Sequence, residues 1–173
     1  MKIVISGGGI GGLTAALCFL HHGAEVTVVE QAAELGEIGA GIQIPPNAMK
    51  VFAALGLDAE LAETAFRPQA IEARMGLSGL ELFRVPLDEH AVNRWGAPYL
   101  HIHRADYIAL LADALHAQSP DALHLNAEVI GYNQTEEVVE VQLADGRRIS
   151  GDVLIGADGI HSAVREQMLG PEK

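Results

Sequence analysis

The chain has 173 residues, which favours about one domain, and its 49% hydrophobic and 20% charged residues are typical of a globular protein with a core. A formal charge of −12 disfavours nucleic acid or an anionic membrane as a partner, because binding phosphates requires a basic surface. No apolar stretch approaches the roughly 18 residues of a membrane span, and no targeting pattern begins the sequence. We therefore expect a cytoplasmic protein.

The first 30 residues predict a strand, a glycine-rich turn, a helix and a second strand. An apolar strand over 2–5 runs into glycines at positions 7, 9 and 12, which have the spacing G-x-G-x-x-G. Apolar residues three and four apart predict a helix over 10–22 that stops at Gly23. The next strand, over 25–30, ends in Glu30. This unit with a terminal carboxylate is typical of a dinucleotide site.

Each part of this unit has a physical role at such a site. Gly7 allows the tight turn, Gly9 lets a pyrophosphate approach the backbone, and Gly12 lets the helix pack closely on the strand. The helix N-terminus presents N–H groups and the positive end of its dipole to the phosphates. The Glu30 carboxylate can accept hydrogen bonds from ribose hydroxyls. The alternative is a turn that only packs the helix, and Glu30 disfavours it.

The middle of the chain begins with a segment rich in glycine and proline. Residues 36–47 are expected to form an ordered loop rather than a helix. Pro46 is suited to begin a helix that Gly56 ends. The next expected elements are a helix over 58–65, two antiparallel strands within 69–87, a strand over 99–103 and a helix over 104–117.

The last third of the chain predicts an antiparallel meander and a return to a buried sheet. Its expected strands cover 122–126, 129–132, 138–143, 147–150 and 152–155, with a turn at Asp145-Gly146 and a final helix from about Ser162. Strands that are apolar on consecutive residues predict a parallel sheet buried on both faces and covered by helices. We therefore expect an α/β fold, with a Rossmann-like βαβ unit, a parallel sheet and a small antiparallel β-meander.

Four segments, in this order, resemble those of the single-component flavoprotein aromatic hydroxylases, the family that includes salicylate and 4-hydroxybenzoate hydroxylases. They are GGGIGG at 7–12 with Glu30-Gln31, GAGIQIPPNA at 39–48, HIHRAD at 101–106 and GADGIHSAVR at 156–165. One glycine motif alone would be weak evidence, whereas four at these separations are specific. The resemblance covers nearly the whole chain and looks closest to the salicylate and 6-hydroxynicotinate hydroxylases.

The resemblance implies an FAD cofactor, NADH or NADPH as electron donor, and O₂. In this family a flavin C4a-hydroperoxide transfers an oxygen atom to an activated ring, while the protein positions the cofactor and excludes water. The implied substrate is a small hydroxylated aromatic or N-heteroaromatic acid. No catalytic residue is assigned within this chain. His101 and His103 share one side of their strand, yet no carboxylate or cysteine set completes a metal site.

The same segments imply which residues bind the cofactor. Carried over position by position, they are Gly7, Gly9, Ile10, Gly11 and Gly12 for the pyrophosphate, Glu30 and Gln31 at the adenosine ribose, Gln43 near the flavin, Arg104 at the pyrophosphate, Val129 at adenine, and Asp158 with Gly159 for FAD and NAD(P)H. Arg104 could instead be a solvated residue at a helix start, although a cation there is unfavourable without an anion. Asp158 could instead be a turn or N-cap residue.

The resemblance also implies parts that this sequence does not contain. The family has a later flavin motif whose aspartate binds the ribityl chain, and a sheet that binds the substrate. We therefore expect residues 1–173 to be an incomplete FAD/NAD(P)-binding domain without its substrate domain, and inactive as a hydroxylase on its own. The apolar surface left uncovered is expected to favour self-association.

Two other functions remain open. The first is a non-catalytic nucleotide-binding module, or one part of a split flavoenzyme. The second is an NAD-dependent dehydrogenase, which shares the glycine motif; Arg104 and the Asp158-Gly159 motif favour FAD over NAD at this site. NADP is disfavoured there, because Glu30 would repel a 2′-phosphate.

Overall fold

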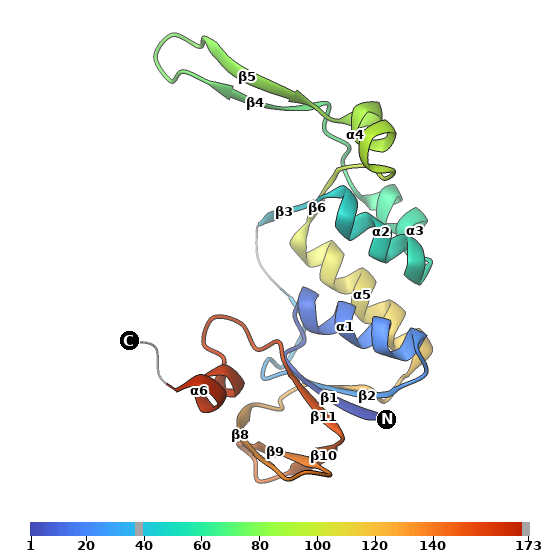
Figure 1. Cartoon of the computed structure of the whole chain (residues 1–173), viewed down its shortest axis with the longest axis vertical. Helices are drawn as coiled ribbons and strands as arrows, with labels where there is room; N and C mark the ends of the chain where they lie inside the picture. Colours follow the sequence, from blue (N-terminus) through green and yellow to red (C-terminus); the bar gives the residue numbers. More distant parts are fainter. Residues whose placement is uncertain (37–39, 171–173) are drawn as a thin grey trace. The chain divides into compact units, whose positions relative to one another are not determined.

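The computed structural model describes residues 1–36 and 40–170, which divide into two compact units (Figure 1). Unit 1 comprises Met1–Gly36 and Ile108–Lys173, and unit 2 comprises Glu37–Tyr107. The boundary falls within helix α5 (Arg104–Gln118), which begins in unit 2 and continues in unit 1. This helix confirms the one expected over 104–117.

Unit 1 contains the expected βαβ unit and a parallel sheet. Its strands lie in the order β11-β1-β2-β7, and every neighbouring pair is parallel. The elements are β1 (Lys2–Ser6), α1 (Ile10–His21), β2 (Glu25–Val29), β7 (Leu123–His124) and β11 (Val153–Gly156). Gly23 ends the turn after α1 with a φ of +77°, as the sequence predicts. The strand expected over 122–126 is shorter than predicted, because only two of its residues pair with β2.

Both faces of this sheet are buried, but they are covered by different elements. Helix α1 lies on one side of β1 and β2 in Figure 1, where Ile3 and Ile5 are fully buried. An antiparallel meander of β8 (Val129–Gln134), β9 (Val139–Leu143) and β10 (Arg148–Gly151) lies on the other side. The meander confirms the predicted hairpin and third strand. The expectation that helices cover both faces is wrong, because alternate strand residues such as Val4 pack against this second sheet.

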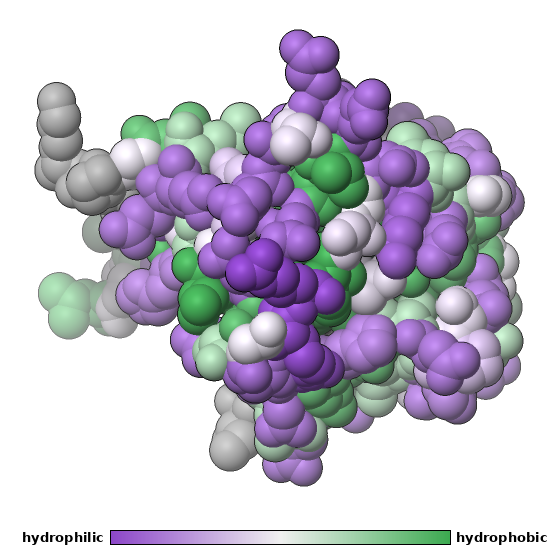
Figure 2. Space-filling view, turned by 90° about the horizontal axis from the view of Figure 1, so that it is seen from below, coloured by the Kyte–Doolittle hydropathy of each residue, from purple (hydrophilic) through white to green (hydrophobic). Residues whose placement is uncertain are grey.

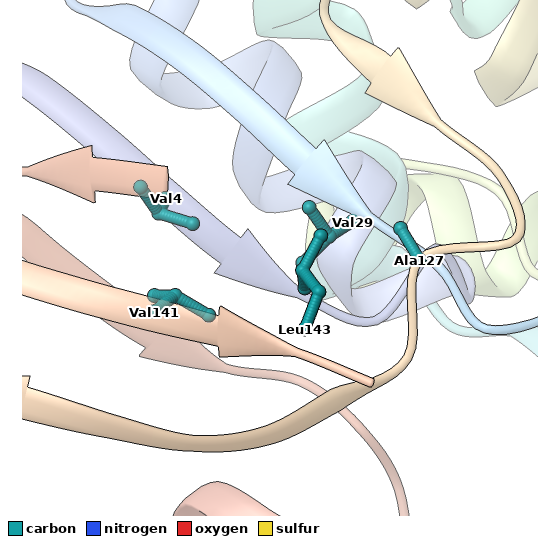
Figure 3. Packing of buried hydrophobic residues seen from close by; sticks show 5 residues of the cluster. All are labelled: Val4, Val29, Ala127, Val141 and Leu143. Carbon is teal, nitrogen blue, oxygen red and sulfur yellow. The ribbon is translucent and has the colours of Figure 1, made fainter. Parts of the chain in front are cut away.

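The contact between the two sheets is a small aliphatic core. Figure 3 shows Val4 of β1 and Val29 of β2 facing Val141 and Leu143 of β9, with Ala127 beside them. All five are at most 2% exposed. Burying a side chain of valine or leucine size stabilises a fold by about 1.5–3 kcal/mol. This core therefore fixes the meander on the sheet that carries the glycine turn.

The C-terminal part of unit 1 agrees closely with the structure predicted from the sequence. Gly146 has a φ of +88° in the predicted turn between β9 and β10, and the backbone N–H of Arg147 donates to Asp145 Oδ1 at 2.9 Å. Helix α6 (Ala163–Leu169) begins after Ser162, whose Oγ accepts from the N–H of Arg165 at 2.9 Å. This is the N-cap that a serine provides.

Unit 2 is built on two antiparallel strands and three short helices. Strand β3 (Gly41–Ile44) pairs with β6 (Leu100–His103), and the helices are α2 (Pro46–Leu55), α3 (Asp58–Thr64) and α4 (Asp88–Trp95). Pro46 begins α2 and Gly56 ends it with a φ of +74°, as predicted. The expectation of a loop over 36–47 is wrong for 41–44, which form β3; residues 37–39 lie outside the described part of the chain. Helix α4 was not expected, because only Ala91 of its eight residues is buried.

The predicted strands within 69–87 form a two-stranded hairpin of β4 (Ala70–Arg74) and β5 (Glu81–Pro86). Figure 1 draws it as a ribbon extending beyond α4. One face carries apolar side chains, with Ile71 opposite Val85 and Ala73 opposite Phe83. Phe83 is 54% exposed. The other face carries ion pairs of Glu72 with Arg74 and Arg84.

These ion pairs predict an acid-sensitive hairpin. Hydrogen bonds and charge from Arg74, followed by the charge of Arg84, lower the pKa of Glu72. Because the folded pKa is depressed, the stabilisation is present above the unfolded pKa and is lost as pH falls through the folded value. In a carboxyl ¹³C NMR titration, we expect Glu72 to titrate below its ordinary range. Arg74→Met should raise its pKa and Arg94→Met should not; an unchanged pKa in Arg74→Met would contradict the assignment.

The surface carries no large apolar area on the face drawn in Figure 2. Hydrophilic side chains predominate there, and the apolar ones form small separate areas. Within residues 1–36 and 40–170, the helices are all too short or too polar to cross a bilayer.

Candidate cofactor site

The glycine turn of unit 1 is built tightly between two strands. The N–H of Gly7 donates to the carbonyl of Val29 at 2.8 Å, and Gly7 has a φ of +109°. A Cβ on Gly7 would collide with the backbone carbonyl of Ala157, which follows β11. Gly7 is therefore required both by its dihedral angle and by this close approach.

The other glycines of the motif divide into a packed one and two open ones. A Cβ on Gly12 would collide with the carbonyl oxygen of Gly7, so α1 can sit this close to the turn only with glycine there. A Cβ on Gly9 or on Gly11 would meet no atom within 4 Å. Gly9 is also the N-cap of α1 and supplies no side chain to cap it. The start of α1 therefore offers backbone N–H groups beside open space, which suits a pyrophosphate.

Glu30 links the turn to the end of β2. Its Oε2 accepts from the N–H of Gly8 at 2.6 Å, and its Oε1 accepts from the N–H of Ala32 at 2.8 Å. A carboxylate has about four acceptor positions, so two bonds leave capacity for ribose hydroxyls. Gly8 was missed by the sequence analysis: a Cβ there would lie 2.9 Å from the Glu30 Cβ. The run of three glycines at 7–9 was the available signal.

Asp158 organises the start of α6. Its Oδ1 accepts from Ser162 Oγ at 2.5 Å, and its Oδ2 accepts from the N–H of Val164 at 3.2 Å. Ser162 in turn caps the helix. Asp158 therefore has the structural role of a turn residue, which was the alternative that the sequence left open. Gly159 beside it has a φ of +78°. The N–H of Ala157 donates to the carbonyl of Ser6 at 2.7 Å, which places this loop against the glycine turn.

Gln31 and Val129 complete the predicted residues of unit 1. Gln31 follows Glu30 directly and is exposed. Val129 pairs with Leu143 at the start of β8, just after Ala127, whose N–H donates to the carbonyl of Glu30 at 2.8 Å. Unit 1 thus brings the glycine turn, Glu30 and the Asp158 loop together, with β8 beginning next to Glu30.

Unit 2 carries Gln43 in strand β3 and Arg104 directly after strand β6. Gln43 lies opposite His101, and its Oε1 accepts from the Tyr99 hydroxyl at 2.6 Å. Burial raises the pKa of Tyr99, so its hydroxyl stays protonated and can donate. Arg104 begins α5, and its N–H donates to the carbonyl of Ala40 at 2.9 Å. The described residues contain no group of three or more metal-ligating side chains.

Comparison with known proteins agrees with this arrangement. Residues 1–171 match the family described as FAD binding domain. The chain is 42% identical over 169 residues to 3-hydroxybenzoate 6-hydroxylase 1 of Aquipseudomonas alcaligenes, covering 98% of this chain and 43% of that protein. It is 37% identical over 171 residues to 6-hydroxynicotinate 3-monooxygenase of Bordetella bronchiseptica, covering 99% of this chain and 44% of that protein.

A solved structure is similar to this chain over nearly its whole length. HpxO of Klebsiella pneumoniae, complexed with FAD and uric acid, superposes with a TM-score of 0.83 at 31% identity, over 99% of this chain and 42% of that one. The chain thus spans less than half the length of these relatives. The open glycine turn, the helix N-terminus and the Glu30 carboxylate fit the adenosine diphosphate part of FAD. The chain belongs to the FAD binding domain family.

Proposed function

We propose that the chain is the FAD-binding part of an NAD(P)H-dependent flavoprotein monooxygenase that hydroxylates a small aromatic or N-heteroaromatic acid. The observation that carries the proposal is the meeting of three motifs at Gly7: the glycine turn, Glu30 and the loop of Asp158. The names of two relatives, a 3-hydroxybenzoate hydroxylase and a 6-hydroxynicotinate monooxygenase, support the substrate class.

The residues have separate tasks in this proposal. The N–H groups of Ile10, Gly11 and Gly12 at the start of α1 bind the pyrophosphate, and Gly9 leaves room for it. Glu30 accepts from the ribose, with Gln31 beside it, and the backbone at Val129 contacts adenine. FAD, when bound, accepts hydride from NADH or NADPH and activates O₂.

Three further residues belong to the same proposal. Asp158 and Gly159 hold the loop that meets the glycine turn, and their role toward FAD and NAD(P)H is proposed from the family motif. Gln43 is assigned to the flavin end and Arg104 to the pyrophosphate, because Arg suits bidentate binding of phosphate. Tyr99 holds the Gln43 side chain through its hydroxyl.

The extent of the domain and its partners are also proposals. Residues 1–173 would form an FAD/NAD(P)-binding domain whose substrate-binding part lies elsewhere. The partners would be an aromatic acid and O₂, without nucleic acid or membrane, in the cytoplasm. Self-association is proposed through the exposed apolar face of the β4–β5 hairpin, because a two-stranded hairpin is marginally stable alone.

Equilibrium dialysis tests the proposed cofactor. The chain should bind FAD and bind NAD and NADP at least tenfold more weakly; NAD binding without FAD binding would instead support the dehydrogenase alternative. Oxidation of NADH by the FAD-loaded chain should not respond to 3-hydroxybenzoate or 6-hydroxynicotinate. Product formed by this chain alone would contradict the proposal that these residues bind the cofactor without completing a hydroxylase.

A further inference from the structure

The outer edge of the meander in unit 1 is met by a side chain rather than by a strand. Among the described residues, no other strand pairs with the outer edge of β8, because the meander has the order β10-β9-β8. Backbone groups at such an edge need partners, and an open edge also invites pairing with another chain. Helix α6 packs against β8 and supplies a partner at Tyr132 (Figure 1).

The partner is the side-chain amide of Gln167, on the last turn of α6. Its Oε1 accepts from the backbone N–H of Tyr132 at 2.9 Å, and its Nε2 donates to the Tyr132 carbonyl at 2.6 Å. One amide thus makes both bonds that a residue of a neighbouring antiparallel strand would make. A Cβ on Gly131 would lie 3.0 Å from Gln167 Oε1, so the glycine before Tyr132 leaves room for this approach.

The other end of α6 is joined to the loop of Asp158. Ser162 is 6% exposed, and its Oγ both donates to Asp158 Oδ1 and accepts from the N–H of Arg165. The N–H of Val164 donates to Asp158 Oδ2 at 3.2 Å. Gln167 lies on the next turn of this short helix. Helix α6 therefore connects the loop of Asp158 to one residue of β8.

Strand β8 changes register between this residue and its own first residue. Val129 and Gly131 pair with successive residues of β9, which leaves Ile130 as the extra residue of a β-bulge. A bulge bends its strand and re-aims the residues beside it. The direction of the backbone at Val129 therefore depends on how the residues after the bulge are held, and Gln167 holds Tyr132.

We infer that Gln167 is a positioning residue for the adenine of the cofactor and acts through the backbone of β8. It fixes Tyr132 against α6, and thereby fixes the bulge and the backbone at Val129. Because α6 also carries the bonds to Asp158, one helix holds two separate parts of the site. The inference rests on the proposed function, in which the backbone at Val129 contacts adenine.

Hydrogen exchange, followed by ¹⁵N NMR on the cofactor-free chain, tests the bond itself. Gln167→Met keeps the length of the side chain and removes both polar groups, so the Tyr132 amide should exchange at least about tenfold faster. Val141, which is fully buried in β9, should exchange as in the unchanged chain. An unchanged rate at Tyr132, or equal acceleration at Tyr132 and Val141, would overturn the inference, because it requires a local effect.

The chain offers a matched control for this variant. Gln134→Met makes the same chemical change at an exposed residue of the same strand. It should leave the exchange of the Tyr132 amide unchanged. Acceleration at Tyr132 by Gln134→Met as large as that by Gln167→Met would overturn the inference.

Two ligands that differ only in adenine test the positioning role. ADP and ribose 5-diphosphate, which is ADP without its base, are titrated into the chain by calorimetry. Gln167→Met should weaken the binding of ADP about fivefold or more and leave that of ribose 5-diphosphate unchanged. Gln134→Met should bind both ligands as the unchanged chain does. A merely structural role of Gln167 would weaken both ligands equally, and that result would overturn the inference.

The outcomes distinguish this inference from the proposed function. Binding of ADP that Gln167→Met leaves unchanged would overturn the inference alone. Failure of the unchanged chain to bind either ADP or FAD would contradict the proposed function and overturn the inference with it.

Discussion

Replacing Gly12 with alanine is expected to abolish detectable FAD binding by the chain and to lower its stability. The added Cβ would meet the carbonyl oxygen of Gly7, which is backbone and cannot move without opening the turn. Overpacking of this kind costs about 1–3 kcal/mol, and the displaced N–H groups would no longer face the pyrophosphate. Equilibrium dialysis measures the FAD affinity, and urea unfolding measures the free energy of unfolding.

Two other glycines provide controls for this experiment. Gly11→Ala lies in the same helix with open space around its Cβ, so it should raise the free energy of unfolding by up to about 1 kcal/mol through helix propensity. Gly76→Ala lies in the hairpin turn of unit 2, also in open space, and should leave FAD affinity unchanged. Wild-type FAD affinity in Gly12→Ala would contradict the steric argument.

Replacing Glu30 with glutamine is expected to weaken FAD binding about tenfold or more. The carboxylate accepts from two backbone N–H groups, those of Gly8 and Ala32, and it would also accept from the ribose. A glutamine has one oxygen, so its NH₂ group would face an N–H donor. Hydrogen bonds to charged groups contribute about 1.5–3 kcal/mol, and 1.4 kcal/mol corresponds to a tenfold change in affinity.

The matched control for this change lies on β2, the strand that ends just before Glu30. Glu25→Gln removes an exposed carboxylate of β2 that lies 3.9 Å from the Lys2 ammonium. Surface ion pairs of this kind contribute little, so FAD affinity should be unchanged. Equal FAD affinities for Glu30→Gln and Glu25→Gln would contradict a role for Glu30 at the ribose.

The elements that the sequence predicted well are those with local signals. Strand β1, helix α1 and strand β2 were predicted from an apolar run, a glycine turn and helical spacing, all within 30 residues. Strand β3 was missed because it lies within a glycine- and proline-rich segment and forms only by pairing with β6, far along the chain. Helix α4 was missed because its sequence, DEHAVNRW, has too few apolar residues to show a period.

The candidate site, too, could be predicted from the sequence only where the signal is local. The roles of Gly7 and Gly12 in the turn could be read from the motif, and the structure gives each the expected steric reason. The bond from Gly8 to Glu30 could not be read, because it depends on how β2 ends beside the turn. The sequence also did not predict the cavity of unit 2 lined by Lys50, Ile71, Trp95 and Tyr99, because these residues lie in separate segments of the chain.

The contact between Gly7 and Ala157 has a consequence for how the protein is made. Strand β1 lies between β2 and β11, and the turn after β1 is closed by a carbonyl about 150 residues later. During synthesis on the ribosome the glycine turn emerges first. One edge of β1 then remains unpaired until the strand at Val153–Gly156 has been synthesised. Such distant pairing is slow to form. Nucleotide binding during synthesis should therefore appear late and abruptly.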